Sequence, residues 1–518
     1  HTRLQGDWSS DVCSSDHLSI GADQATGDLA PAARPGAAGD ADPAQGFAVS
    51  PFRPPESNGG LSQFRGQSFH APSGFFPSGS DGAKPFLNYY MKIAIVGLGY
   101  VGLPLALQFA RNGVEILGLD VDPAKIDALN GGRSYINHIE ASSVQAEVTA
   151  GRFTASTDFS RIKSVEAVVI CVPTPLNKNR EPDISYVLNS GRAIAPHLAR
   201  GALVALESST YPGTTDTDLR RVLEEGSGLK AGVDFHLAFS PEREDPGNPD
   251  SKVATIPKVL GALTPACMEK AKAVYGRAIQ TLVPVSSCRA AEATKLLENI
   301  FRSVNIALVN ELKLVYAAMD IDVWEVINAA KTKPFGYMAF YPGPGLGGHC
   351  IPIDPFYLTW KAREYGQLTK FIELAGEVNT AMPLHVVNRT AEALNAARKP
   401  VNGSRVLLLG LAYKANVDDM RESPTFVLMD ELNRRGAEVA YYDPFIPVIT
   451  PTREHGQWTG KKSIEWSREQ VGAYDAVIIA TAHSGVDYRQ LTEWAGLIID
   501  TRNALVGIPT KAGQVWKA

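Results

Sequence analysis

A cysteine on a glycine-rich loop is the most reactive group in the chain. The segment PGPGLGGHCIPID, residues 342–354, places the thiol of Cys350 after the imidazole of His349 and before the carboxylate of Asp354. Glycines adopt backbone angles that other residues avoid, so we expect a loop rather than a helix or strand. A buried structural thiol is the usual role of a cysteine, and it suits most of the other cysteines here. On this loop a nucleophilic thiolate is favoured instead.

Lys295 and Asn299 share one face of a predicted helix. Residues 288–318 contain neither glycine nor proline, and apolar side chains recur at steps of three and four residues, which predicts one long helix. These apolar residues are Leu296, Ile300, Val304, Leu308, Leu312 and Val315. The helix alone leaves open whether Lys295 and Asn299 form a solvated pair or part of a site. We also expect this helix to be a spine and a dimerisation surface.

A dinucleotide-binding pattern begins at Met91. The apolar run MKIAIV predicts a buried parallel strand, and GLGYVG then places Gly97, Gly99 and Gly102 in G-x-G-x-x-G spacing. Gly97 is expected to make the tight turn, Gly99 to let a pyrophosphate approach, and Gly102 to let helix and strand pack. The alternative is a glycine-rich turn without a ligand.

The residues after this turn predict the cofactor. A helix that ends at Gly113 follows, and its N-terminus, with Tyr100 and Val101, is expected to bind the phosphates. The next strand ends at Asp120, which is expected to bind the ribose hydroxyls and to repel a 2′-phosphate. We therefore predict NAD rather than NADP.

Three further predicted strands end in residues that suit a ligand crevice. Ligands of open α/β sheets bind at the carboxyl ends of the strands, so these ends are expected to converge, although each residue alone could be a cap or turn residue. They are Pro173, Thr174 and Pro175 after a strand with Cys171 in its core, then Ser208, Ser209 and Thr210, then Glu242, Arg243, Glu244 and Asp245.

A second α/β unit is predicted from Gly403 onward. It lacks G-x-G-x-x-G, and its first loop carries Lys414 and Arg421 among acidic residues. Ser423 and Pro424 are a favourable helix start. Two later strands end in His483 and Asp500. We expect a nucleotide cofactor in the first unit and a second phosphate-bearing ligand in this one.

Composition limits the class of protein. The chain has 518 residues, 44% hydrophobic content and a formal net charge of −5, so we expect two or three globular domains and no nucleic-acid partner. Five cysteines without a CxxC pair argue against a disulfide framework or a zinc site and favour the cytoplasm. No apolar run reaches the ~20 residues of a membrane span, and no secretory signal is recognisable.

We predict an α/β fold with two Rossmann-like doubly wound domains joined by a long central helix, preceded by a disordered segment. A short helix is expected within residues 322–333, and a later helix is expected to be interrupted at Pro383 and to end near Lys399. Residues 1–90 are rich in Gly, Pro, Ala and Ser. Met91 is our hypothesis for the natural start, with a regulatory tail as the alternative. The predicted domains are 1–90 disordered or non-native, 91–285 NAD-binding, 286–400 central and helical with the cysteine loop, and 401–518 a second Rossmann-like domain for the phosphate-bearing ligand.

Together these motifs resemble the UDP-glucose/GDP-mannose dehydrogenase family of nucleotide-sugar 6-dehydrogenases, from Met91 to about Leu505. The motifs are GLGYVG, CVPTP, ESSTYPGTT, FSPERED, ATKLLEN, PGPGLGGHCIPID and GLAYKANVDDMRESP. The resemblance implies a four-electron oxidation of a sugar C6 hydroxyl to a carboxylate with two NAD. It also implies that Cys350 is the nucleophile, which forms a thiohemiacetal and then a thioester that water hydrolyses.

The resemblance implies that residues 401–518 form a UDP-sugar-binding domain, and it assigns roles to further residues. Lys295 and Asn299 match the pair that holds the developing oxyanion, and they also contact the substrate. Asp354 matches an aspartate that organises a water and the lysine. The remaining matches are Thr210 near the cofactor and the water, Pro173 and Thr174 at the cofactor, Gly347 and Lys414 at the substrate, and Arg421 near the cofactor and the domain interface.

Two departures indicate the branch of the family. The UDP-glucose branch has serine before the cysteine, where this chain has His349, and a second glutamate where this chain has Pro246. Glu242 is therefore expected to take part in thioester hydrolysis in a different way from its counterpart in the UDP-glucose branch. GGHCIPIDPFYL and SPEREDPGN resemble the branch that oxidises UDP-N-acetylhexosamines, particularly UDP-N-acetylglucosamine, for surface polysaccharides.

Several alternatives stay open. UDP-glucose, UDP-N-acetylmannosamine or UDP-N-acetylgalactosamine could be the substrate, since pocket contacts decide this. A second interpretation is an NAD-binding epimerase or reductase in which Cys350 is structural, although no Tyr-x-x-x-Lys motif follows a Rossmann strand. A non-catalytic nucleotide-binding module is a third. No metal ion is expected, and we expect a homodimer or a higher homo-oligomer.

Overall fold

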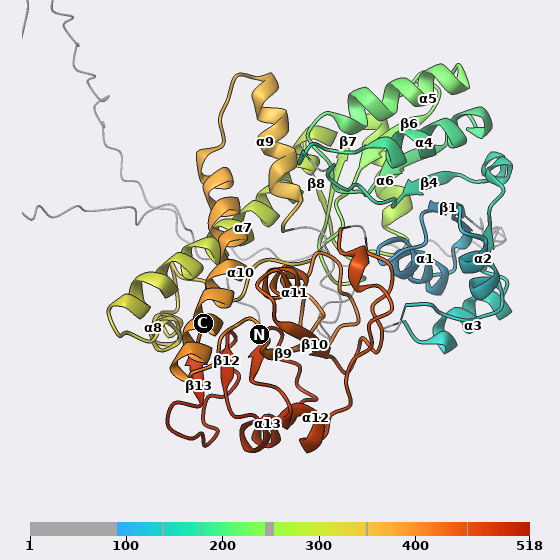
Figure 1. Cartoon of the computed structure of the whole chain (residues 1–518). Coiled ribbons are helices and arrows are strands. Elements are labelled where there is room, and N and C mark those ends of the chain that lie inside the picture. The colour runs from blue at the N-terminus through green and yellow to red at the C-terminus, as the bar shows by residue number, and fades with distance from the viewer. Residues whose placement is uncertain (1–90, 137–138, 178, 244–252, 349–350, 453) are drawn as a thin grey trace, which may run out of the picture. The chain divides into compact units, whose positions relative to one another are not determined.

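The computed structural model describes residues 91–136, 139–177, 179–243, 253–348, 351–452 and 454–518. Within these residues the chain forms two α/β units connected by long helices, which confirms the predicted fold class (Figure 1). The segment predicted to be disordered, residues 1–90, lies outside the described residues, as do His349 and Cys350. No helix of the described part is both long and apolar enough to cross a membrane.

The first unit is built on an eight-stranded sheet with the order β3-β2-β1-β4-β5-β6-β7-β8. Among the described strands of this sheet, β6 and β7 alone pair antiparallel. The strands are β1 (Lys92–Val96), β2 (Glu115–Leu119), β3 (Phe153–Ser156), β4 (Ala167–Ile170), β5 (Leu203–Leu206), β6 (His236–Phe239), β7 (Lys258–Ala262) and β8 (Leu282–Pro284). The helices are α1 (Gly102–Arg111), α2 (Pro123–Asn130), α3 (Ala141–Thr149), α4 (Ser185–Ile194), α5 (Arg220–Ser227) and α6 (Pro265–Tyr275), with the short 3-10 helices η1 (Phe159–Ser164) and η2 (Ala195–His197) and the π-helix η3 (Thr214–Leu219).

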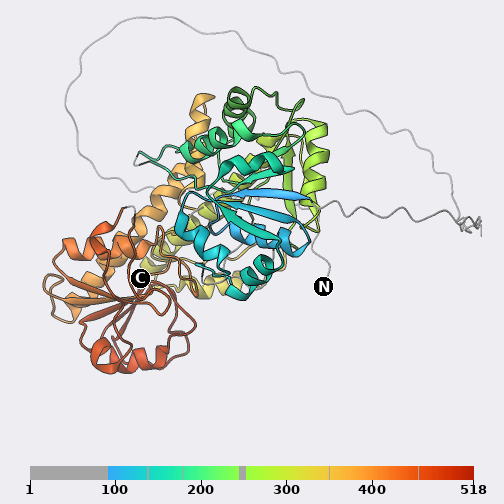
Figure 2. The same ribbon diagram turned by 90° about the vertical axis from the view of Figure 1, so that its right-hand side faces the viewer.

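Both faces of this sheet are covered, which explains its near-continuous apolar strands. Ile93 and Ile95 of β1 belong to one core cluster, with α1 and α6. Ala94 and Val96 alternate with them and belong to the cluster on the other face, with α4 and α5. Figure 2 shows helices on both sides of the blue and green strands.

The order of the strands indicates where a ligand would bind to this sheet. From β1 the chain moves outward to β2 and β3, and it then returns to β4 on the other side of β1. The direction of winding therefore reverses between β1 and β4, and ligands of such sheets bind at this point. The GLGYVG turn follows β1 and the CVPTP turn follows β4, so both predicted cofactor motifs lie at this reversal.

The described residues of the central part form four helices: α7 (Cys288–Ala318), α8 (Val323–Ala330), α9 (Asp354–Glu364) and α10 (Lys370–Ala396). The long helix predicted for 288–318 is confirmed, and so is the short helix within 322–333. α10 packs along α7 (Figure 1). The predicted interruption at Pro383 is wrong, because α10 continues through this residue. Its buried face runs from Ala375 to Leu394, and this long packing outweighs the hydrogen bond that proline cannot donate.

The second unit has a five-stranded parallel sheet with the order β10-β9-β11-β12-β13. Its elements are β9 (Arg405–Leu409), α11 (Pro424–Arg434), β10 (Glu438–Tyr442), η4 (Gly456–Trp458), α12 (Arg468–Gly472), β11 (Ala476–Ile479), α13 (Tyr488–Trp494), β12 (Ile498–Asp500) and β13 (Val515–Lys517). The predicted cap is confirmed, since the Ser423 hydroxyl accepts the N–H of Thr425 at 3.3 Å. The reversal point lies between β9 and β11, beside the loop that carries Lys414 and Arg421.

An aspartate ends β10 as Asp120 ends β2, but its surroundings differ. Asp443 Oδ2 accepts the N–H groups of Leu411 at 2.7 Å and Ala412 at 2.9 Å. The same oxygen lies 3.1 Å from His483 Nε2, and both side chains are fully buried. A fully buried histidine therefore lies against this carboxylate, whereas Lys125, the side-chain partner of Asp120, is 35% exposed.

Candidate active site

The three glycines after β1 have three different environments. Gly97 has a φ of +91°, and a Cβ there would lie 2.7 Å from the Cys171 carbonyl oxygen. A Cβ on Gly102 would lie 1.9 Å from the Gly97 carbonyl oxygen. A Cβ on Gly99 would meet no atom of the described residues within 4 Å. This matches a tight turn, close helix–strand packing and an open approach for a pyrophosphate.

Asp120, predicted to bind a ribose, lies at the end of β2 beside the glycine turn. Its Oδ2 accepts the N–H of Leu98 at 2.9 Å, and its Oδ1 accepts the N–H of Asp122 at 3.1 Å. Lys125 Nζ lies 3.3 Å from Oδ2. These contacts orient the carboxylate at the end of β2, next to the glycine turn, where the ribose of a dinucleotide lies. The residues present therefore fit NAD.

The separate roles of Gly99 and Gly102 can be tested. Gly99→Val is expected to leave the fold intact but to weaken NAD binding by about tenfold or more, because its side chain would fill the approach of the pyrophosphate. Gly102→Ala is the control and is expected to lower the stability by about 1–3 kcal/mol, because its Cβ has no room. Thermal unfolding and NAD titration of both variants would measure this. Unchanged NAD affinity in Gly99→Val would contradict the assignment.

The turn after β4 is held by the central part. The Tyr357 hydroxyl of α9 donates to the carbonyl oxygen of Thr174 at 2.8 Å and lies 3.3 Å from that of Pro175. Thus α9, which begins just after the cysteine loop, holds the turn of Pro173 and Thr174.

Lys295, Asn299 and Asp354 come together in one buried cluster. Asn299 Nδ2 on α7 donates to Asp354 Oδ2 at the start of α9, at 2.5 Å. The Lys295 ammonium interacts electrostatically with the same carboxylate. All three are buried. Asp354 therefore connects the end of the cysteine loop to the polar face of α7.

Burial changes the acidity of this cluster. It raises the pKa of Asp354 to about 6, against the opposing effects of Lys295 and of hydrogen bonds from Asn299 and Ser209. Arg302 donates to Asn299 Oδ1 and so fixes the orientation of the amide. A carboxyl group with a pKa near neutrality can exchange a proton with a substrate or a water at ordinary pH.

Thr210 lies in a loop that α7 also holds. Its Oγ1 is 2.6 Å from Thr214 Oγ1, and both side chains are buried. Glu292 Oε2 accepts the N–H of Gly213 at 2.7 Å, and its Oε1 accepts the N–H and the hydroxyl of Thr215 at 2.9 and 2.7 Å. Burial raises the pKa of Glu292 to about 7. Glu292 thus fixes the loop that carries Thr210.

Glu242 follows β6 and lies next to the cluster. Its carbonyl oxygen accepts from Lys295 Nζ at 2.5 Å. Its carboxylate lies 3.9 Å from Lys258 Nζ. The predicted neighbours Glu244 and Asp245 lie outside the described residues. In the described part, no group of three or more His, Cys, Asp and Glu side chains could hold a metal ion.

The described part of the cysteine loop contacts both α7 and the second unit. The Gly343 N–H donates to Asn310 Oδ1 of α7 at 3.0 Å. A Cβ on Gly343 would lie 2.3 Å from the Arg502 guanidinium, and one on Gly347 would lie 2.7 Å from Tyr413 Cβ. The Gly348 N–H, the last described group before Cys350, donates to the Arg421 carbonyl at 3.3 Å. The second unit therefore sets the path of the chain toward Cys350.

The Arg421 side chain contacts residues of both α/β units. Its guanidinium donates to both oxygens of Asp419, at 2.8 and 2.5 Å. It also lies 4.5 Å above the ring of Tyr100, in the GLGYVG turn. Lys414 is half-buried on the same loop, one residue after Tyr413. The loop after β9 thus connects the glycine turn to the cysteine loop.

α7 has an inverted distribution of side chains. Its buried face carries polar and charged residues, and its exposed face carries large apolar ones. The buried polar residues are Glu292, Lys295, Asn299, Ser303, Asn310 and Lys313, and the exposed apolar residues include Leu297, Phe301, Leu308 and Val315. Of the predicted apolar stripe, only Leu296 is fully buried. Sequence reasoning missed Arg302 and Asn310, although helical spacing places Asn310 on the face of Asn299. It also missed Arg502, which local sequence does not indicate.

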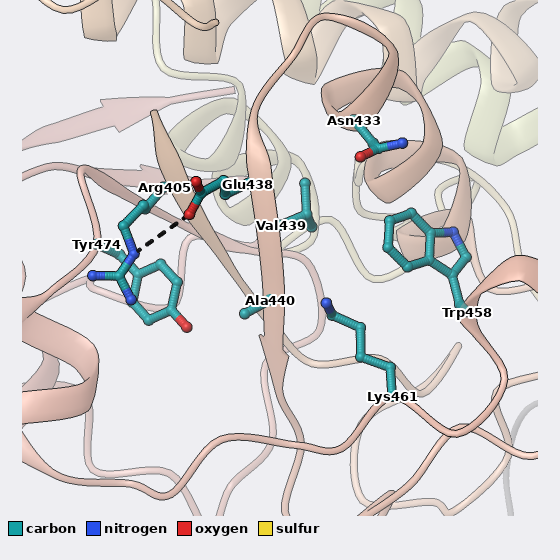
Figure 3. Close-up of a pocket in the computed structure, with 8 residues that line it drawn as sticks. All are labelled: Arg405, Asn433, Glu438, Val439, Ala440, Trp458, Lys461 and Tyr474. Atoms are coloured by element: carbon teal, nitrogen blue, oxygen red, sulfur yellow. Dashed lines mark ion pairs between the residues drawn. The ribbon is translucent and has the colours of Figure 1, made fainter. Parts of the chain in front are cut away.

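A surface cavity of about 310 Å³ lies elsewhere, in the second unit (Figure 3). Its lining residues are Arg405, Asn433, Glu438, Val439, Ala440, Trp458, Lys461 and Tyr474. Arg405 and Glu438 are the first residues of β9 and β10. The cavity therefore opens by the amino ends of these strands, whereas the candidate site lies at carboxyl ends, so we do not assign it to the reaction.

Comparison with known proteins identifies the family. The chain matches the UDP-glucose/GDP-mannose dehydrogenase family in its NAD binding domain (residues 91–279), central domain (289–381) and UDP binding domain (407–507). It is 35% identical to the UDP-N-acetyl-D-glucosamine 6-dehydrogenase of Pseudomonas aeruginosa over 395 residues, covering 76% of this chain and 91% of that protein. It is 34% identical to the UDP-N-acetyl-D-mannosamine dehydrogenase of Pyrococcus horikoshii, with coverage of 80% and 96%.

A solved structure agrees with these sequence matches. The UDP-D-ManNAc dehydrogenase of Pyrococcus horikoshii superposes with a TM-score of 0.75 at 32% identity. The superposition covers 82% of this chain and 99% of that one. The three domain matches and this superposition span the whole described arrangement of cofactor turn, central helices and second α/β unit. The chain therefore belongs to the UDP-glucose/GDP-mannose dehydrogenase family and is an NAD-dependent nucleotide-sugar dehydrogenase.

Proposed function

We propose that this enzyme oxidises the C6 hydroxyl of a UDP-N-acetylhexosamine, UDP-N-acetylglucosamine in the first instance, to the carboxylate. The observation that carries the chemistry is the buried cluster of Lys295, Asn299 and Asp354 at the end of the cysteine loop. The HCIPID and SPEREDPGN segments and the named activity of the Pseudomonas relative support the substrate. UDP-N-acetylmannosamine is the second candidate, because a relative of nearly equal identity carries that name.

Each of these residues has its own role in the proposed reaction. When bound at the glycine turn, NAD accepts a hydride in each of the two oxidations. Lys295 and Asn299 stabilise the oxyanion on C6 by a positive charge and an amide N–H. The Cys350 thiolate adds to the aldehyde carbon, and the resulting thiohemiacetal is oxidised to a thioester. Water then attacks the acyl carbon, the C–S bond breaks, and its electron pair returns to sulfur.

We propose the same division of the chain as the sequence suggests: residues 91–285 bind NAD, 286–400 carry the catalytic helix and the cysteine loop, and 401–518 bind the UDP-sugar. The positions of the three family matches support these bounds. We further propose that the enzyme acts in the cytoplasm and supplies uronic acid sugars for surface polysaccharides.

The test is the amount of NADH formed per sugar consumed, measured with the full chain and a panel of UDP-sugars. Two NADH per UDP-N-acetylglucosamine, with poor activity on UDP-glucose and UDP-N-acetylmannosamine, is the expected result. Two NADH from another sugar would keep the chemistry and replace the substrate. One NADH or none with every sugar would contradict the proposed function.

We also propose that two copies of the chain pair through the apolar faces of α7 and α10. Phe301, Leu308 and Val315 are seven residues apart and form one exposed stripe on α7. Phe371 and Leu374 on α10 are exposed as well, at 79% and 54%. Exposed apolar surface of this extent is typical of an interface, and a second copy would cover it symmetrically.

The double variant Leu308→Glu/Val315→Glu is expected to be monomeric, because burying two carboxylates would cost more than the contact gains. Sedimentation equilibrium of wild type and variant measures this. Val233→Glu is the control, since Val233 is also exposed, at 74%, but belongs to the first unit. An unchanged assembly in the double variant would place the interface elsewhere.

A further inference from the structure

A lysine lies between two carboxylates inside the first unit. Lys258, the first residue of β7, is only 6% exposed. Its Nζ is 2.8 Å from Glu207 Oε2 and 3.9 Å from Glu242 Oε2. Glu207 follows β5 and is 1% exposed, and the Glu242 side chain is 15% exposed. Three ionisable groups therefore meet where little water reaches them.

Stability alone does not explain this arrangement. Burying charges has a large desolvation cost, and apolar residues of similar size would often stabilise a fold as well or better. Burial acts to lower the pKa of Lys258, but Glu207 and Glu242 outweigh it and raise this pKa. Lys258 therefore stays protonated, and its charge is available to the second carboxylate.

Both carboxylate oxygens of Glu207 accept hydrogen bonds, which fix the orientation of its side chain. The Tyr275 hydroxyl of α6 donates to Glu207 Oε1 at 2.7 Å, while Lys258 binds Oε2. The Lys258 ammonium also lies 5.7 Å from the centre of the Tyr275 ring. A lysine has three N–H donors, so one can serve Glu207 while another is directed at Glu242.

Glu242 is the member of this group whose backbone contacts the candidate site. Lys295 binds its carbonyl oxygen, and Lys258 faces its carboxylate. Glu242 and Lys258 both line a small cavity of about 10 Å³, roughly the space of one water molecule. The charged and titratable groups around Glu242 in the described residues are Lys258, Glu207, Cys171, Tyr275, Lys295 and Arg243.

We propose that Lys258, anchored by Glu207 and Tyr275, is a positioning residue that holds the Glu242 carboxylate as the base for thioester hydrolysis. This inference rests on the proposed function. Glu242 accepts a proton from water as the water oxygen bonds to the acyl carbon. The C–S bond breaks, and Cys350 leaves as a thiolate. Lys258 contacts neither the sugar nor the cofactor in this scheme.

Lys258→Met tests the proposal in the full-length enzyme. Both NADH molecules should still form rapidly in the first turnover, while steady-state kcat falls by about tenfold to a hundredfold because hydrolysis slows. The acyl-enzyme should accumulate and be visible by intact mass. Lys258→Arg should restore much of the rate.

The controls separate this role from a structural one. Lys270→Met removes a partly exposed lysine of the same unit, 3.6 Å from Glu166, and should keep wild-type kinetics. Tyr275→Phe removes one hydrogen bond of Glu207, so it should show a smaller slowing of the same step, and it decides the matter if Lys258→Met does not fold. A parallel loss of the first-turnover NADH and of kcat, or no change in either, would overturn the inference. Failure of wild type to form two NADH would instead overturn the proposed function.

Discussion

Replacing Cys350 with serine is expected to stop turnover after the sugar has become attached to the protein. A serine oxygen can add to the aldehyde, and oxidation then gives an oxygen ester. An alcohol is a much poorer leaving group than a thiol, so water releases the acid slowly. We expect kcat to fall by roughly 10³-fold or more. Intact mass spectrometry with saturating NAD and substrate should show the mass of the substrate less four hydrogen atoms added to the chain.

Two variants make this result specific. Cys350→Ala has no nucleophile and should show equally low turnover with no added mass. Cys288→Ala removes a buried thiol at the start of α7 and should retain turnover without trapping. If Cys350→Ser turned over at the wild-type rate with an unmodified mass, Cys350 would not be the nucleophile, and the thioester scheme would fail.

Replacing Asp354 with asparagine is expected to lower kcat by about 10²- to 10³-fold and to change the pH dependence. Asp354 lies between Asn299 and Lys295, and burial raises its pKa to about 6. Its carboxylate form is needed to accept a proton and to hold the lysine. This form is present above pH 6 and is lost as the pH falls through 6. Wild-type kcat/KM should therefore rise with pH up to about 6 and then level off.

The pH profile of Asp354→Asn should lack this acid limb, because an amide does not titrate. Glu292 is the appropriate comparison, since burial raises its pKa to about 7 while it holds the Thr210 loop and not the cluster. Glu292→Gln should retain the limb near pH 6. If the acid limb persisted in Asp354→Asn but disappeared in Glu292→Gln, Glu292 and not Asp354 would be the group that titrates, and the prediction would be wrong.

The sequence alone determined the elements whose causes are local. The glycine spacing after β1, the continuous helix of residues 288–318 and the Ser423–Pro424 helix start depend on neighbouring residues, and the structure shows all three. Two α/β units also followed from alternating strands and helices. The residues of the candidate site were named from motif matches, and their positions at strand ends followed from the rule for open parallel sheets.

Only the tertiary structure decided which side of each element faces which partner. Of the apolar stripe expected on α7 only Leu296 is buried, and Leu308 and Val315 are exposed. Lys295, Asn299 and Asn310 are buried instead, because the site and α10 cover this face of the helix. α10 runs through Pro383 because packing along α7 outweighs one lost hydrogen bond. Arg502 and Lys258 contact residues that are distant in sequence and belong to other elements. Such contacts depend on long-range packing, which neither local propensity nor motif spacing encodes.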